Sequence, residues 1–92
     1  MTDNLHDERR ARARLEILRA LDRVSGRMLN ENILFADINL HLAPRAHLSE
    51  FQAALLDLEQ MGLIVRVFDT LGGPFRVMIT DAGRAELAAR ET

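Results

Sequence analysis

The chain has 92 residues, which is enough for one hydrophobic core and excludes two independently folded domains. Apolar residues make up 48% and charged residues 28%, a balance typical of globular proteins. The net charge is −2, so a uniformly basic nucleic-acid-binding chain is excluded, although a local basic face is not. The chain contains no cysteine, which excludes disulfides, thiolate catalysis and cysteine–zinc sites.

Targeting signals are missing from the sequence pattern. No stretch approaches the roughly 20 apolar residues that cross a bilayer, and the polar, acidic start is unlike a signal peptide. We therefore expect a cytoplasmic protein of bacterial type. Residues 1–8 are expected to form a flexible tail, and residues 9–92 a single domain.

The first predicted helix covers residues 7–24. Its apolar residues are spaced three and four apart and form one stripe: Leu15, Ile17, Leu18, Leu21 and Val24. Gly26 favours an end to this helix, because glycine readily adopts the left-handed conformation found at helix C-termini.

A second helix is predicted to begin near Asn30, a residue type that caps helix N-termini well. Its apolar face would comprise Leu34, Ile38 and Leu42. The helix must end before Pro44, because the residue that precedes proline is disfavoured in the helical conformation.

The third predicted helix has the clearest pattern. Its main apolar residues recur at helical spacing: Phe51, Leu55 and Leu58. Two starts fit equally well, since Ser49 with Gln52 and His47 with Glu50 both have the spacing of a capping box. Gly62 marks the expected end of this helix.

After Gly62 the pattern changes to that of strands. Residues 63–68 and 75–79 are rich in β-branched and aromatic side chains, and the turn-forming residues 69–74 separate them, which predicts a β-hairpin. Thr80 then caps a last predicted helix over residues 81–89. The expected fold is mainly α with a β-hairpin (α+β), in the order helix-helix-helix-strand-strand-helix.

Two segments resemble the winged helix-turn-helix family. Residues 51–64 resemble the third helix of that family as it runs into the wing, and residues 75–84 resemble its returning strand and the Thr-Asp-x-Gly-Arg start of its closing helix. Residues 14–21 and 29–34 are also similar to small ArsR-like winged-helix proteins of Mu-like phages and prophages. The resemblance implies a small, dimeric DNA-binding regulator of transcription.

By this resemblance, the third helix enters the major groove of double-stranded DNA. Ser49 and Gln52 are then candidates for contacts with bases. Arg45, which precedes this helix, and Arg66 and Arg76, which lie on the wing strands, are candidates for contacts with phosphates.

One basic run lies near the N-terminus and contains Arg9, Arg10, Arg12 and Arg14. Such an arm could follow a phosphate backbone. The alternative is a solvated helix end whose arginines alternate with acidic residues.

Charge counted along the chain opposes DNA binding. Residues 1–27 carry +2, residues 28–64 carry −4 and residues 65–92 carry zero, so the segment with the expected DNA-reading helix is the most acidic. The alternative function is therefore a protein-protein interaction module that does not bind DNA. Candidates for its partner surface are the apolar residues whose burial the pattern does not settle: Phe35, Leu48, Leu71 and Phe75.

Other chemistry finds no support in the pattern. His41 and His47 do not share a helix face, so no metal site is expected. Gly72 and Gly73 lack the lysine and following helix of a phosphate-binding loop, and no serine has nucleophile-elbow spacing. We expect no enzyme, no cofactor and no small-molecule ligand. A homodimer is expected, through the first helix or the alanine stripe of the closing one.

Overall fold

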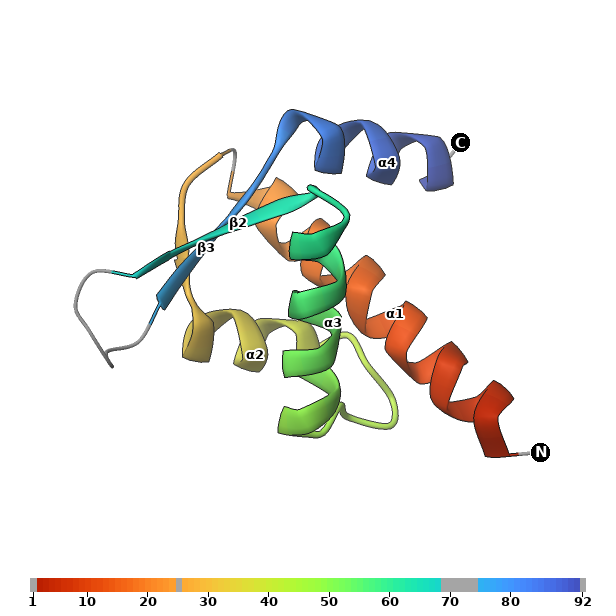
Figure 1. The fold of residues 1–92 in the computed structure, drawn as a ribbon. Coiled ribbons are helices and arrows are strands. Elements are labelled where there is room, and N and C mark those ends of the chain that lie inside the picture. The colour runs from red at the N-terminus through yellow and green to blue at the C-terminus, as the bar shows by residue number, and fades with distance from the viewer. Residues whose placement is uncertain (1, 25, 69–74, 92) are drawn as a thin grey trace.

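The computed structural model describes residues 2–24, 26–68 and 75–91 (Figure 1). It confirms a mainly helical α+β fold. In chain order the elements are α1 (Thr2–Arg23), β1 (Leu29–Asn30), α2 (Glu31–Asn39), α3 (Leu48–Gln60), β2 (Ile64–Phe68), β3 (Phe75–Ile79) and α4 (Asp81–Glu91).

The three strands form one antiparallel sheet in the order β1-β3-β2. The expected hairpin is confirmed, with Ile64 opposite Ile79 and Phe68 opposite Phe75. Strand β1 was not predicted. It has two residues, of which Leu29 lies opposite Val77, and a strand this short leaves no periodicity in the sequence.

Helix α1 begins at Thr2, so the expectation of a tail over residues 1–8 is wrong for the residues described. The polar composition of this segment suggested a tail. It contains no glycine or proline that would stop a helix, however.

The caps of α2 and α3 settle two expectations. Asn30 caps α2 as predicted, because its side-chain oxygen accepts a hydrogen bond of 2.8 Å from the backbone N–H of Asn32. At α3 the second of the two starts is correct: His47 is the N-cap, and its backbone N–H donates to the Glu50 carboxylate at 2.8 Å.

Helix α2 ends at Asn39, well before Pro44. The buried Asn39 side chain holds the following loop, because its oxygen accepts from the Ala46 N–H at 2.7 Å and its amide donates to the Ala46 carbonyl at 3.4 Å. The chain thus turns back between α2 and α3 on side-chain hydrogen bonds.

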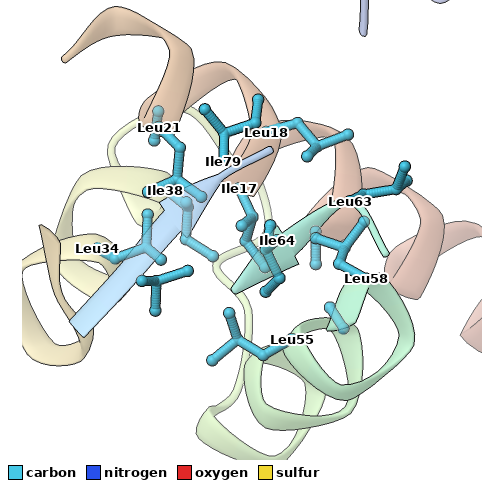
Figure 2. Close-up of a cluster of buried hydrophobic side chains, with 14 of the residues drawn as sticks. Ile17, Leu18, Leu21, Leu34, Ile38, Leu55, Leu58, Leu63, Ile64 and Ile79 are labelled. Carbon is cyan, nitrogen blue, oxygen red and sulfur yellow. The ribbon is translucent and has the colours of Figure 1, made fainter. Parts of the chain in front are cut away.

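All four helices and the hairpin contribute to one core. In Figure 2 its side chains point toward one another from α1, α2, α3 and the two longer strands. The largest fully buried ones are Ile17, Leu21, Leu34, Ile38, Phe51, Leu55, Leu58, Ile64, Val77 and Ile79. Removal of these side chains from water is the main stabilising contribution to the fold.

The corner between β3 and α4 depends on Thr80 and Gly83. The Thr80 hydroxyl donates to the Gly62 carbonyl at 2.8 Å and accepts from the Gly83 N–H at 3.0 Å. A Cβ at Gly83 would collide with the carbonyl oxygen of Leu63. Glycine at this position therefore allows α4 to approach the turn that follows α3.

Candidate nucleic-acid interface

Helix α3 has a buried face and an exposed face. Phe51, Ala54, Leu55 and Leu58 are buried against the core. The opposite side of the helix bears a row of uncharged side chains, which we call the outward row: Ser49, Gln52, Ala53, Leu56 and Gln60. All are exposed except the half-buried Ala53. In Figure 1, α3 lies between the N-terminal half of α1 and the strands β2 and β3.

The flank of α3 that faces α1 carries two carboxylates, and both are ion-paired. Glu50 accepts two hydrogen bonds from Arg9, at 2.7 and 2.8 Å. Asp57 accepts two from Arg10, each at 2.6 Å, and one from Arg14 at 3.0 Å. Arginine matches a carboxylate with two parallel N–H groups, which makes such pairs strong for their class.

These contacts favour the ionised carboxylates. The Arg9 guanidinium and the His47 backbone N–H lower the pKa of Glu50 from 4.5 to about 2. Hydrogen bonds from Arg10 lower the pKa of Asp57, and burial opposes that shift. Both side chains are only 18% exposed, so the pairs are partly shielded from water.

The other flank of α3 faces the hairpin and is also paired. The Arg66 guanidinium of β2 donates to the Glu59 carboxylate and lowers the pKa of that group. The same guanidinium lies 5.2 Å from the ring centre of Phe75 and 5.9 Å from that of Phe68. Its Nε is buried and has no hydrogen-bond partner among the described residues. The half-buried Arg66 side chain is therefore held against α3 and the two phenylalanine rings of the hairpin.

Four of the five carboxylates in residues 28–64 are in ion pairs with arginines from elsewhere in the chain. Besides the three on α3, Asp37 of α2 pairs with Arg23 of α1 at 2.9 Å. The net charge of −4 counted for residues 28–64 therefore leaves out the arginines that pair with these carboxylates. The surface around α3 is close to neutral, because the partners come from residues 9–23 and 66.

The predicted phosphate-contacting arginines fall into two groups. Arg9, Arg10 and Arg66 are engaged with α3, and of the two interpretations of the basic run this favours a helix end over an extended arm. Arg45 and Arg76 are exposed at the start of α3 and on β3. Arg12 is exposed on α1 and has no ion pair within the described part of the chain.

The two predicted base-contacting residues remain accessible. Ser49 and Gln52 are exposed, and they lie on the outward row near the N-terminal end of α3. The structure therefore brings Arg45, Ser49 and Gln52 to the same end of one helix.

The residues predicted to form a partner surface do not share one exposed patch in the described structure. Phe35 is half-buried with its ring 5.0 Å from that of Phe51, and Phe75 is half-buried beneath Arg66. Leu48 is 53% exposed, and Leu71 lies outside the described residues. The sequence analysis missed Leu56, which is 43% exposed in the middle of the outward row. Its helical phase, opposite Phe51, was the available signal.

The described residues contain neither a cluster of metal ligands nor a membrane-spanning helix. Within them, no group of three or more histidine, aspartate or glutamate side chains is placed to hold a metal ion, and His47 serves as the N-cap of α3. None of the helices described is both long and apolar enough to cross a membrane.

Comparison with known proteins gives no match to a family model, a curated protein or a solved structure. The function is therefore inferred from the geometry of α3 and its neighbours.

Proposed function

We propose that the protein is a winged-helix module that binds double-stranded DNA through α3, and that it serves as a small transcriptional regulator. The order of helices and the β1-β3-β2 sheet support the winged-helix assignment. The observation that carries the functional proposal is the pairing of every α3 carboxylate with an arginine, which leaves an uncharged outward row.

The outward row has the chemistry for reading bases. Gln52 can donate and accept hydrogen bonds with adenine in the major groove, and the Ser49 hydroxyl can contact a base or a phosphate. Unpaired carboxylates on this helix would repel phosphates. The ion pairs remove that repulsion at the flanks of α3.

Few arginines near α3 remain as candidates for phosphate contacts, because Arg9, Arg10 and Arg66 are paired with its carboxylates. Arg45 precedes α3 and Arg76 lies on β3, and both residues are exposed, so we assign the phosphate contacts to these two positions. Two such contacts supply a small counterion-release term. We therefore expect weak binding to random-sequence DNA and a larger share of the affinity from base contacts.

A protein-protein interaction module is the second candidate, and a specific observation favours it. Leu48 at the start of α3 and Leu56 two turns later are both about half exposed, and exposed apolar surface of this kind can belong to a protein interface. The acidic segment no longer supports this candidate, because its carboxylates are paired.

Fluorescence anisotropy with a labelled random-sequence duplex in about 50 mM salt tests the proposal. We expect binding in the micromolar range, and we expect Arg45→Ala and Arg76→Ala each to weaken it several-fold. Arg27→Ala is the matched control, since Arg27 is an exposed arginine outside α3 and the hairpin. Unchanged anisotropy at the highest protein concentration would reject DNA binding and favour the interaction module.

A further inference from the structure

An apolar cavity of about 190 Å³ lies where α1, the end of α3 and α4 meet. Its floor consists of the buried side chains of Leu18, Leu58 and Leu63, and its sides include Leu15 and Met61. Pockets for drug-sized ligands begin at roughly 300 Å³, so this volume suits a smaller molecule.

The rim of the cavity is cationic. Arg12, Arg14 and Arg90 line it together with a single carboxylate, Glu86. Arg90 is paired with Glu86 at 3.0 Å. Arg12 has no ion pair among the described residues, which leaves its guanidinium available for a ligand.

The positive charge still exceeds the negative charge when the charged side chains next to the rim are included. Arg14 shares the Asp57 carboxylate with Arg10, so that one anion faces two guanidiniums. A shallower hollow adjoins the cavity through Arg14, Met61 and Arg90, and Asp7 lines it. With all of these groups counted, four arginines face three carboxylates.

We propose that this cavity binds an amphiphilic monocarboxylate, a single apolar chain that ends in one carboxylate. The leucine floor would hold the chain, and the guanidinium of Arg12 would pair with the carboxylate at the rim. The site was invisible in the sequence, because its lining residues come from three helices and a turn. It revises the expectation that no small molecule binds.

The test uses octanoate as the probe and the full-length, ¹⁵N-labelled protein without DNA. Octanoate is expected to shift the amide resonances of residues around the cavity saturably, with a Kd on the order of 0.1–1 mM. Octylammonium has the same chain with the opposite charge, and it should bind at least about tenfold more weakly. Acetate lacks the chain and should cause no saturable shift.

Three variants separate the parts of the site. Arg12→Ala should weaken octanoate binding about tenfold, and Ala11→Phe should abolish it by filling the mouth of the cavity from α1. Arg27→Ala, an exposed arginine that does not line the cavity, should leave binding unchanged. The dispersion of each amide spectrum reports directly whether the variant is folded.

Several outcomes would overturn the proposal. Equal binding of octanoate and octylammonium would show that the rim charge has no role. Shifts that spread over exposed apolar residues elsewhere, such as Leu40 and Phe68, would show non-specific adsorption. A sedimentation mass of two chains with no octanoate binding would mean that a second copy covers the cavity. Because no DNA is present, the result is independent of the proposed function.

Discussion

The flank of α3 that faces α1 and the outward row differ in chemistry although they belong to one helix. The flank toward α1 carries Glu50 and Asp57, and both are fixed by arginines more than forty residues away in the chain. The outward row carries no charged side chain and makes no ion pair. The charge of a sequence segment and the charge that its surface presents can therefore be quite different.

The ion pairs on the flank affect arrangement more than stability. Exposed pairs contribute about 0–1 kcal/mol each, although bidentate geometry and partial burial strengthen them. Their larger effect is on which arginines are available to contact DNA. An arginine that already holds a carboxylate of α3 cannot contact a phosphate without breaking that pair first.

The largest expected effect is the difference in stability between a substitution on the buried face of α3 and one on the outward row. Leu55→Ala removes a fully buried side chain and should lower the free energy of unfolding by about 2–5 kcal/mol. Leu56→Ala, its neighbour on the outward row, should change it by less than about 0.5 kcal/mol. Urea denaturation of both variants measures the contrast. A large loss for Leu56→Ala would place this residue in the core.

The second largest effect is expected at Glu50, whose contribution to the free energy of unfolding depends on pH. The lowered pKa of Glu50 means that its ionised form stabilises the fold fully above about pH 4.5, and that this contribution is lost as the pH falls toward 2. Glu50→Gln keeps an oxygen acceptor for the His47 N–H and removes the charge. Its free energy of unfolding should be lower than that of the wild type by about 1–2 kcal/mol at pH 7.

The difference between wild type and Glu50→Gln should shrink on acidification. Denaturation at several values between pH 7 and 2 measures it, and the comparison cancels the contributions of other acidic groups. Parallel curves would show that the Arg9 pair is absent in solution.

A smaller effect is expected at Asp57, which lacks the helix-capping contribution of Glu50. Asp57→Asn leaves Arg10 and Arg14 without their anion and should lower the free energy of unfolding by about 1 kcal/mol. Asp22→Asn on α1 is the control, because Asp22 is exposed and has no ion pair among the described residues. Equal midpoints in urea for the two variants would argue against the pairing on this flank.

The smallest effect on stability is expected at Gln52. Gln52→Ala lies on the outward row and should leave the free energy of unfolding within about 0.5 kcal/mol of wild type. Affinity for a duplex selected for tight binding should fall by about 1–3 kcal/mol, whereas binding to random sequence should not change. An equal loss on both duplexes would contradict base reading by Gln52.

The local parts of the fold could be predicted because short-range rules determine them. The cap at Asn30, the hairpin and the helix ends at Gly26 and Gly62, where φ is 84° and 75°, all follow from neighbouring residues. Strand β1 could not be predicted, because two residues become a strand only by pairing with β3. The start of α1 could not be predicted from polarity, because a polar segment without glycine or proline can be helical.

In the candidate interface, too, the features that depend on neighbouring residues could be predicted and those that depend on packing could not. Helical phase correctly placed Ser49 and Gln52 on the exposed side of α3, since it depends only on spacing within the helix. The engagement of Arg9, Arg10 and Arg66 depends on which helix packs against which. A count of charges along the chain therefore assigned to α3 a negative charge that its packed surroundings neutralise.

The salt dependence of DNA binding tests most directly whether α3 presents a neutral reading face with its flanking arginines committed internally. Anisotropy with random-sequence duplex at about 50 and 200 mM salt measures it. Two phosphate contacts, from Arg45 and Arg76, predict a loss of affinity of about tenfold over this range. A loss of about a thousandfold would require six contacts, and would mean that the ion pairs open on DNA. Absence of binding at the lower salt would contradict the DNA-binding function itself.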